Sequence, residues 1–471
     1  MRYRTSTPSS TRPLHLVTVL ERVLTTVLTS AVAVHLCGTA VAAPSAMVDS
    51  NVLVVDDDGG VGVNFLDLPA AVAAATDGET LLVKPGTYSA FVLFDKGIDI
   101  VADTSGGTGT VTCNGGPSIR QLSAGKRATL RGLKIVNANE AGLQIKSCAG
   151  DVWIEDCKMT GAQGDGTFTD PDPHPNGYAG AEIATSARVV FNRCTITGGL
   201  GADYLPLVGI HGNGGPGVYV RASSVALYQC AIKGGNGGSV ADDDAPWSGG
   251  DGGIGLQVFS GETMCSGCTI AGGIGGMGGE DFDIFVGWSC GDGGSGGAAI
   301  GQAYGDPGPG DVQLRDCTLT PGAGGAPYPG ASCSFGQAGP IFDVMSVSVA
   351  TFAGDAFSHL AVSPMRDGGT AFFAMKGTPG SYAVLGISTA PTLFLDPFLG
   401  GTILIDVAST ALLYPGFLPF SGAKQVIVSV NLGIAASQGL SLFTQPIFVV
   451  PPTFELVVGA GSVLTVLDPN L

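Results

Sequence analysis

The chain has 471 residues, a net charge of −18 and 76 glycines, and only 13% of its residues are charged. A surface this acidic repels nucleic acid and anionic membranes, which excludes them as partners. Glycine at this level without a collagen period, together with 45% hydrophobic residues, indicates many short strands joined by turns and few helices.

Residues 1–42 have the features of an export signal. Four arginines precede an apolar run that ends in Ala40-Val41-Ala42, a small-residue cleavage pattern. An uncleaved membrane anchor is the alternative, because the run is about long enough to span a bilayer. We expect cleavage, secretion or surface location, and no membrane insertion afterwards. Eleven cysteines fall to ten without Cys37, in a compartment that permits disulfides.

A short helix is expected in the segment 51–101, before the repeats begin. Asp67 can cap a helix over residues 68–75, with Pro69 in its first turn, where the missing N–H is not needed. Gly78 then ends the helix. Repeat proteins need a covered end, so we expect this helix to shield the first repeat.

The next region repeats a short motif around a cysteine, as in "VVFNRCTITGG" from Val189 and "VALYQCAIKGG" from Val225. Each copy follows a short apolar segment and precedes a Gly-rich insertion. Units of three short strands cannot bury an apolar face alone, but they can by stacking. The sequence therefore predicts a right-handed parallel β-helix over 43–345, with cysteine-bearing coils over 128–322. The recurring cysteines are Cys157, Cys194, Cys230, Cys268 and Cys317.

The recurring cysteine is predicted to be a packing residue. An earlier coil carries Leu133 in the same position, and a position that accepts leucine faces the interior. Metal ligation and disulfides between stacked neighbours are the less favoured alternatives. Alternation along the strand is expected to turn Glu155, Asp156 and Lys158 outward. Cys290 and Cys333 lie in Gly-rich insertions on one edge, and they form the best disulfide candidate.

The segment Val54 to Val101 resembles the start of the pectin-lyase-like superfamily of secreted right-handed β-helices. The shared features are Asp-Gly, a phenylalanine, a short Ala-rich helix, "DGETLLVKPGTY" and "DKGIDIV". The resemblance covers about residues 50 to 345, and it implies the fold and contact with polysaccharide. It does not imply an activity, because the motifs of pectin methylesterases, polygalacturonases and pectate lyases are incomplete or missing.

Residues 346–471 lack the cysteine repeat and contain apolar strand-like runs separated by Pro, Gly and Ser turns. This pattern predicts a β-sandwich-like domain. The stretch "LLYPGFLPFSG" resembles the all-β module that ends many exported bacterial repeat proteins. Two roles are open: capping the C-terminal end of the β-helix, or docking onto a cell surface or a partner.

The Gly-rich insertions should all leave the stack at one corner and form one loop-built face. Aromatic rings stack on sugars, and carboxylates bind sugar hydroxyls or Ca²⁺. Two carboxylates from neighbouring loops could also form an acid and base pair. The alternative is that these loops are merely solvated. The candidate ligand-binding residues are Tyr204, His211, Trp247, Trp288 and Tyr328; the candidate Ca²⁺ ligands are Asp170, Asp172, Asp242, Asp244 and Asp281; the candidate catalytic pair is Asp243 and Asp283.

The many Gly-x-Gly-x-x-Gly matches in this region are attributed to composition, since they do not sit between a strand and a helix. The sequence thus favours a non-catalytic exported scaffold that binds carbohydrate or another extracellular surface component. A polysaccharide-degrading hydrolase or lyase, with or without Ca²⁺, is the alternative. A purely structural rod is the third interpretation.

Overall fold

The computed structural model describes residues 50–103, 109–136, 140–165, 174–203, 211–240, 247–283, 287–302, 310–327, 333–343, 347–396, 401–436 and 438–471. These residues belong to one compact unit. Within them the structure is almost entirely β, and α2 (Leu68–Ala74) is the one α-helix. No helix in these ranges has both the length and the apolar character needed to cross a bilayer.

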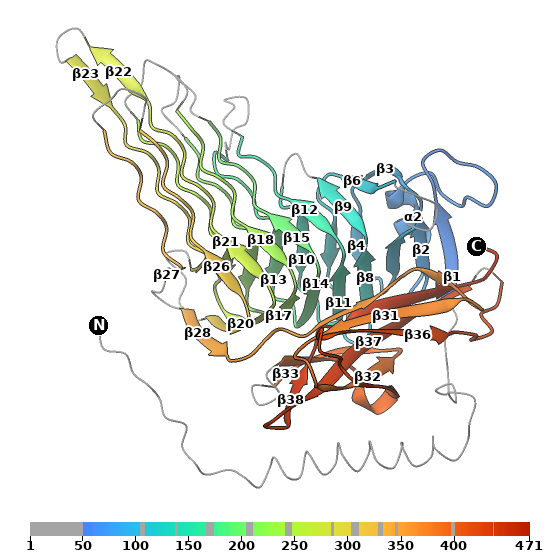
Figure 1. Ribbon diagram of the computed structural model, residues 1–471. Coiled ribbons are helices and arrows are strands. Elements are labelled where there is room, and N and C mark those ends of the chain that lie inside the picture. The colour runs from blue at the N-terminus through green and yellow to red at the C-terminus, as the bar shows by residue number, and fades with distance from the viewer. Residues whose placement is uncertain are drawn as a thin grey trace. The chain divides into compact units, whose positions relative to one another are not determined.

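Three parallel sheets form the walls of a right-handed β-helix (Figure 1). Sheet 1 contains β1 (Ser50–Val55), β2 (Thr80–Val83), β5 (Asp99–Ala102), β8 (Arg127–Arg131), β11 (Asp151–Glu155), β14 (Arg188–Asn192), β17 (Ser223–Tyr228), β20 (Gly261–Ser266), β25 (Gly310–Arg315) and β28 (Val347–Phe352). Sheet 2 contains β3 (Gly86–Ser89), β6 (Val111–Asn114), β9 (Leu133–Val136), β12 (Lys158–Thr160), β15 (Thr195–Thr197), β18 (Ala231–Lys233), β21 (Thr269–Ala271) and β26 (Thr318–Thr320). Sheet 3 contains β4 (Val92–Phe94), β7 (Ser118–Arg120), β10 (Leu143–Lys146), β13 (Ala181–Ala184), β16 (Val218–Arg221), β19 (Leu256–Val258), β24 (Ile300–Gly301) and β27 (Phe342–Asp343).

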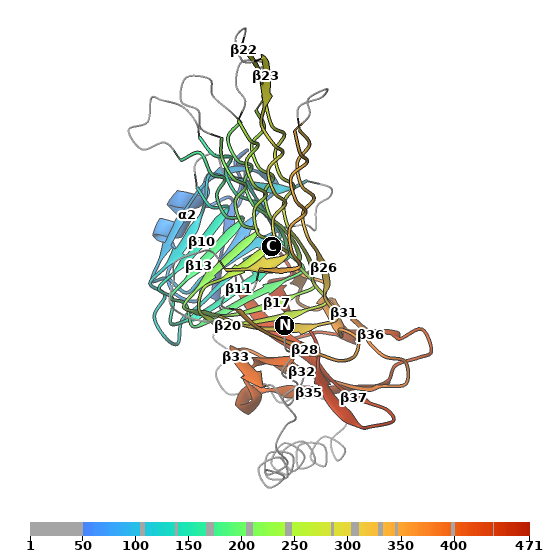
Figure 2. The same ribbon diagram turned by 90° about the vertical axis from the view of Figure 1, so that its left-hand side faces the viewer.

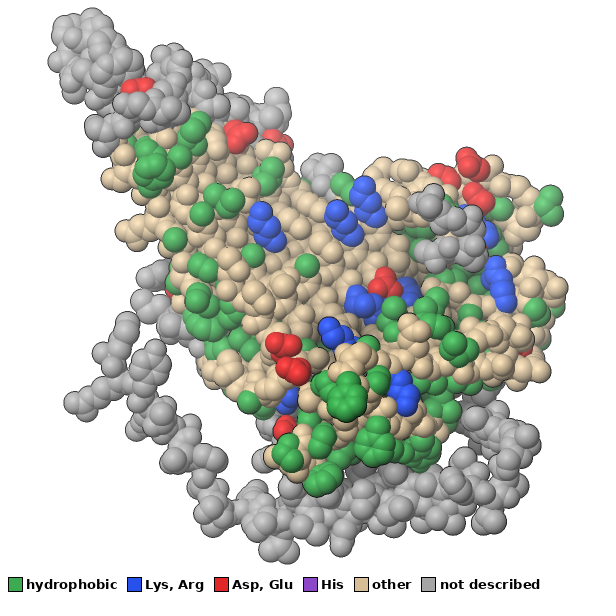
Figure 3. Space-filling model, in the orientation of Figure 1, with side chains coloured by type: hydrophobic (Ala, Val, Ile, Leu, Met, Phe, Trp, Pro, Cys, Tyr) green, Lys and Arg blue, Asp and Glu red, His purple; other side chains and the backbone are tan. Residues whose placement is uncertain are grey.

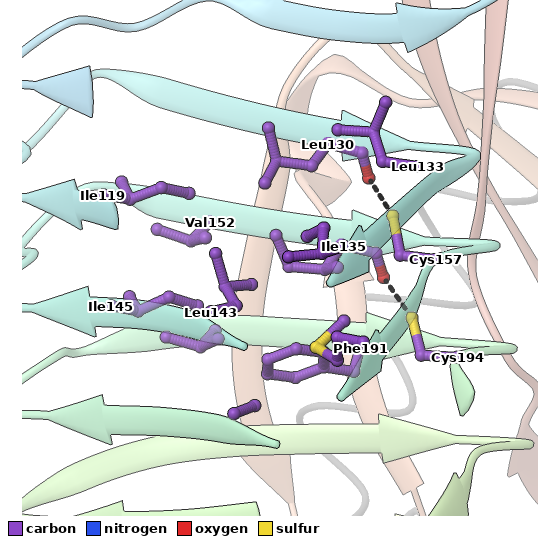
Figure 4. Close-up of a cluster of buried hydrophobic side chains, with 14 of the residues drawn as sticks. Ile119, Leu130, Leu133, Ile135, Leu143, Ile145, Val152, Cys157, Phe191 and Cys194 are labelled. Carbon is purple, nitrogen blue, oxygen red and sulfur yellow. Dashed lines mark hydrogen bonds between the residues drawn. The ribbon is translucent and has the colours of Figure 1, made fainter. Parts of the chain in front are cut away.

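The coils stack in register, so equivalent side chains form columns inside the β-helix. Val152 pairs with Val189, which pairs with Val225, and all three are buried. Side chains alternate across a strand, so every second residue of each short strand joins the interior. Figure 4 shows how these columns meet between the sheets. The expected β-helix is confirmed by this parallel pairing. β28, beyond the boundary expected at residue 345, still pairs with β25 of the last coil.

The recurring cysteines lie at the bend between sheet 1 and sheet 2, and they are packing residues. The residue before the cysteine has a positive φ, as at Asp156 (54°) and Arg193 (52°), which turns the chain inward. The thiol of Cys194 then lies 3.4 Å from the carbonyl oxygen of Asn192 and 3.5 Å from that of Ile154 in the previous coil (Figure 4). A cysteine therefore fills a small apolar position and also donates to carbonyl groups at the bend. Among the described residues, the cysteines without a disulfide are Cys113, Cys148, Cys157, Cys194, Cys230, Cys265, Cys268 and Cys317, all buried except the half-buried Cys317.

The predicted capping helix is confirmed, and it ends one residue earlier than expected. Asp67 caps it, since one carboxylate oxygen accepts the amide of Leu68 at 2.8 Å and that of Ser89 at 2.8 Å. Leu68, Ala71 and Val72 are buried against the first coils. The ammonium group of Lys96 donates to carbonyl oxygens of the last turn. The helix therefore covers the first end of the core.

The C-terminal strands form a two-layered, sandwich-like module. One layer holds β32, β35, β37, β38, β39 and β30; the other holds β29, β31 and β36; β33 and β34 form a separate hairpin. The bounds are β29 (Ser358–Ala361), β30 (Met365–Arg366), β31 (Thr370–Lys376), β32 (Tyr382–Ser388), β33 (Pro391–Asp396), β34 (Gly401–Ile405), 3-10 helix η1 (Val407–Ser409), β35 (Ala411–Phe417), β36 (Ala423–Ser429), β37 (Gln438–Val450), β38 (Glu455–Val458) and β39 (Ser462–Leu467).

This module packs on the outer face of sheet 1, and among the described residues none of its strands pairs with β26, β27 or β28 at the end of the stack. The placement gives no support to the first of the two expected roles, a cap on the C-terminal end of the β-helix. β37 pairs antiparallel with β1. Outward-facing residues of sheet 1 form a buried cluster with residues of the module: Trp153, Val190, Ala226 and Tyr228 with Leu404, Ile405, Phe443, Ala460 and Val463. An apolar outer face on a coil is thus explained by the strands that pack on it.

Glu155, expected to face solvent, is fully buried in this interface. Its carboxylate lies 2.6 Å from Arg193 and 3.3 Å from Arg131, and it accepts the hydroxyl of Ser462 at 2.7 Å. Burial raises the pKa of this carboxyl, but the two guanidinium charges and the hydrogen bonds outweigh burial and leave the pKa below its ordinary value. The prediction that Glu155 faces solvent is wrong because the C-terminal module covers this side chain and donates hydrogen bonds to it. The residues near Glu155 in the sequence give no sign of these partners.

Candidate functional site: the glycine slab and its distal end

The Gly-rich insertions leave the stack at one corner, as the sequence predicts, but they are not loops. In five coils the chain leaves sheet 2, runs outward, turns, and returns to sheet 3 (Figures 1 and 2). The outgoing and returning segments form two layers, which we call the glycine slab. Its described residues are 161–165, 174–180, 198–203, 211–217, 234–240, 247–255, 272–279, 291–299, 321–327 and 333–340.

A Gly-Gly-X pattern organises the hydrogen bonds of the slab with a period of three residues. The amide of the first glycine bonds to the next coil in the same layer, as Gly234 does to the carbonyl of Ala271 at 2.9 Å. The amide of the second glycine crosses to the other layer, as Gly235 does to the carbonyl of Gly215 at 2.8 Å. Three residues per turn is the period of a polyproline-II helix, which has no internal hydrogen bonds and must find partners outside itself.

The close approach of neighbouring segments explains the glycines. A Cβ atom on Gly235 would lie 1.8 Å from the carbonyl oxygen of Gly199, and one on Gly273 would lie 1.8 Å from that of Gly235. Both positions therefore exclude any side chain. Only the third residue of each triplet points outward. Figure 3 accordingly shows a broad tan surface over the slab, because most of what it exposes is backbone.

Asn, Asp and Ser at the third position complete the hydrogen bonding. The side chain of Asn213 accepts the amide of Asp251 at 2.8 Å, and Asp251 in turn accepts the amide of Ser295 at 2.7 Å. Asp292 accepts the amide of Ser334 at 2.8 Å, and Asp203 accepts that of Ser239 at 2.9 Å. These carboxylates accept backbone amides and so link neighbouring segments of the slab.

The distal end of the slab carries a hairpin and a disulfide. β22 (Glu280–Asp283) pairs antiparallel with β23 (Gly287–Cys290), which places Phe282 opposite Trp288. Cys290 is joined to Cys333, the pair that the sequence suggested, with 5.9 Å between the Cα atoms. The link ties the hairpin to the last returning segment. Figures 1 and 2 both place this hairpin at the far end of the slab, away from the C-terminal strands.

Trp247 lies beside the base of this hairpin. Its carbonyl oxygen accepts the amide of Gly279 at 2.9 Å, one residue before β22 begins. Its side chain is 49% exposed. A large, exposed aromatic side chain has the properties of a stacking platform for a ring-shaped ligand.

The structure brings some of the predicted site residues together and leaves others undescribed. Trp247 and the backbone of Asp281, Asp283 and Trp288 meet at the distal end. His211 lies within the slab and is half-buried, which lowers the pKa of its imidazole. The remaining candidates fall outside the described residues: Asp170, Asp172, Tyr204, Asp242, Asp243, Asp244 and Tyr328.

One group of acidic residues in the described ranges could hold a metal ion, and none of the predicted Ca²⁺ ligands belongs to it. Asp56, Asp57 and Asp58 have carboxylate oxygens within 4.8 Å of one another. Asp57 already accepts the amide of Thr87 at 2.7 Å, and Asp56 accepts that of Asp58 at 3.1 Å. These groups support the turn after β1, far in sequence from the slab.

The fold and the slab together define a class: a β-helix scaffold that carries a projecting, hydrogen-bonded plate. No protein-family model matches the sequence, and no curated protein matches it. Among solved structures, the chain is similar to the enzymatically active domain of tailspike protein 2 from bacteriophage CBA120, with 9% identity and a TM-score of 0.21. The match covers 83% of this chain and 66% of that chain. A TM-score this low carries no weight for function, so the β-helix rests on the strand pairing itself.

Proposed function

We propose that this protein is an exported, non-catalytic β-helix scaffold that binds carbohydrate or another extracellular surface component at the distal end of the glycine slab. The observation that supports this function most is the half-exposed Trp247 beside the β22–β23 hairpin, at the far end of a plate held by backbone hydrogen bonds. Aromatic faces stack on sugar rings, and an aromatic side chain has only two rotatable bonds to order on binding.

The slab supports the proposal in a second way. Its acidic and amide side chains are used to hold neighbouring segments, as at Asp251 and Asn213, so its faces carry few free functional groups. Recognition is then expected at the tip, where the chain turns. The C-terminal module packs on the opposite part of the molecule and leaves the tip accessible (Figure 1).

A pull-down on insoluble glycans with purified protein tests this function. Trp247→Ala should reduce the bound fraction at least about tenfold, since buried aromatic anchors dominate such contacts. Phe420→Ala is the matched control, because Phe420 is a fully exposed aromatic residue of the C-terminal module. Equal retention of both variants on every glycan would contradict the proposal. Release of new reducing ends or unsaturated products, lost in Asp283→Asn, would favour the enzymatic alternative instead.

A further inference from the structure

The two ends of the β-helix are finished differently. At the first end, α2 buries Leu68, Ala71 and Val72 against the core. At the other end, β26, β27 and β28 are the last strands of sheets 2, 3 and 1, and within the described part of the chain each pairs on one side only, with β21, β24 and β25. An edge of this kind presents unpaired backbone groups to any strand that approaches it.

The interior columns of the last coil are open to solvent at this end. Leu319 and Val349 are half-buried, whereas their register partners in the preceding coil, Ile270 and Val312, are buried. Phe342 is half-buried in the same way, while its partner Ile300 is buried. Leaving such a column uncovered forfeits part of its hydrophobic stabilisation, which is why solenoid ends are normally covered.

The last returning segment of the slab carries an apolar side chain that points away from the molecule, on the same side as the uncovered strands. In the returning segments, a Cβ atom at the first glycine points toward the outgoing segment of the next coil; at Gly293 it would lie 2.0 Å from the carbonyl oxygen of Gly325. In the last returning segment, the equivalent position is Phe335, and no further coil follows. Phe335 is 73% exposed, and Ile341, at the proximal end of the same returning segment, is 46% exposed.

We propose that a second copy of this chain covers this end through a two-fold, end-to-end contact. Each coil runs from sheet 1 to sheet 2, through the slab, and back by sheet 3, so the slab lies at the corner opposite sheet 1. The proposed two-fold axis crosses the middle of β28 and runs parallel to the long direction of the slab. It places β28 of one copy antiparallel to β28 of the other. It also places sheet 2 of each copy against sheet 3 of the other.

The same axis brings complementary parts of the slab together. It places the returning segment of one copy over the outgoing segment of the other, so Phe335 faces residues 324–326, which are Gly-Gly-Ala. A bulky apolar side chain thus meets a smooth backbone surface. Antiparallel contact between outgoing and returning segments already occurs inside the molecule, as between Gly235 and Gly215. A closed two-fold contact is the commonest symmetry of protein oligomers.

Both slabs would then lie side by side and point in the same direction. Two distal ends on one particle would bind a multivalent surface with higher avidity than one. The pairing itself does not depend on the proposed function of the tip.

Sedimentation velocity of the full chain over a range of concentrations tests the contact. The wild type should sediment as a dimer. Phe335→Lys, at a solvent-exposed position, should weaken dimerisation at least about tenfold, because the charge would be buried in the contact. Phe420→Lys is the matched control, and it should sediment as the wild type does.

A second variant tests the part of the contact that β28 forms. Val349→Lys should also give monomers, since a lysine there can reach water from a free end but not from a covered one. Circular dichroism identifies any variant that does not fold. If the Val349 variant does not fold, the Phe335 variant alone decides the result. A monomeric wild type at all concentrations would overturn the proposal, as would a dimer that persists in every folded variant of the two.

Discussion

The carboxylate of Glu155 in β11 accepts a hydrogen bond from the hydroxyl of Ser462 in β39 at 2.7 Å, joining residues that lie 307 positions apart. The amide of Val463 donates to the other carboxylate oxygen at 3.0 Å. A coil of the β-helix is therefore completed by the C-terminal module, and the two parts share one buried charge network with Arg131 and Arg193.

Glu155→Gln should destabilise the protein strongly. The side chains of Arg131 and Arg193 are only 6% and 17% exposed, so removing the negative charge leaves a buried and a largely buried cation with Asp156 as their remaining ionic partner. We expect the free energy of unfolding to fall by about 3 kcal/mol, the order found when one member of a buried pair is removed. Chemical denaturation monitored by tryptophan fluorescence measures the change.

Glu182→Gln is the matched control for this prediction. Glu182 pairs with Lys146 at 3.0 Å on the outer face of sheet 3, where both side chains are about one-third exposed. A pair of this kind contributes less than about 1 kcal/mol. A loss of similar size in both variants would mean that the buried network does not hold the module in place.

Stability should decrease on mild acidification because of His359. This histidine is buried between β31 and β37, and burial lowers the pKa of its imidazole to about 3. Its unfolded pKa is about 6.5, so below that pH the unfolded state binds a proton that the folded state does not. His359 therefore lowers the free energy of unfolding as the pH drops from about 6.5 toward 3, by about 2 kcal/mol between pH 7 and pH 5. Asp151 acts in the opposite direction over this window, because burial raises the pKa of its carboxyl to about 6, so the comparison with a His359 variant isolates the histidine.

Denaturation at these two pH values compares the wild type with His359→Gln. The variant lacks the buried imidazole at this position, so its stability should change less over this window. Glu155 contributes only at lower pH, because its folded pKa lies below the ordinary value and its stabilisation is lost as the pH falls through that pKa. His211→Gln should have a smaller effect, since His211 is only half-buried. An unchanged slope in the His359 variant would disagree with this assignment.

The recurring cysteines at the bend between sheets 1 and 2 should resist alkylation in the native protein. Burial raises the pKa of the Cys157 and Cys230 thiols, and the reactive species is the thiolate. We expect iodoacetamide to label Cys157, Cys194 and Cys230 only after denaturation, with slow native labelling at the half-buried Cys317. Peptide mapping by mass spectrometry locates the label. Rapid native labelling at Cys194 would be incompatible with an interior column.

The β-helix could be predicted from the sequence because its signal is repeated at fixed spacing. One coil has Leu133 where the others have a cysteine, and this leucine predicted that the cysteine column faces the interior of the β-helix. Leu133 is indeed buried. The outer face of sheet 1 could not be predicted in the same way. Trp153 and Tyr228 are buried there only because the C-terminal strands cover them, and nothing in their own coils identifies that partner.

The slab was missed for a different reason. Its period of three is visible in "GGNGGS" from Gly234 and "GGIGGMGGE" from Gly272, but the sequence analysis considered only Gly-x-Gly-x-x-Gly matches, which it attributed to composition. The need for glycine comes from segments of other coils, such as Gly199 against Gly235, and their distance is set by the stacking of the β-helix. A search for Gly-Gly-X at equal distances from successive cysteines would have found it.

Gly235→Ala should disrupt the slab although alanine is the smallest possible change. Its Cβ atom would lie 1.8 Å from the carbonyl oxygen of Gly199, so the segments must move apart and weaken hydrogen bonds on both sides. We expect a loss of about 1–3 kcal/mol, as for overpacked cores. Leu200→Ala, at an exposed third position, should cost less than about 0.5 kcal/mol. Hydrogen exchange adds a local measurement, since the amides of Gly235 and Gly273 should exchange faster in the Gly235 variant and not in the Leu200 variant. Unchanged exchange in the Gly235 variant would show that the two layers are not packed through these glycines.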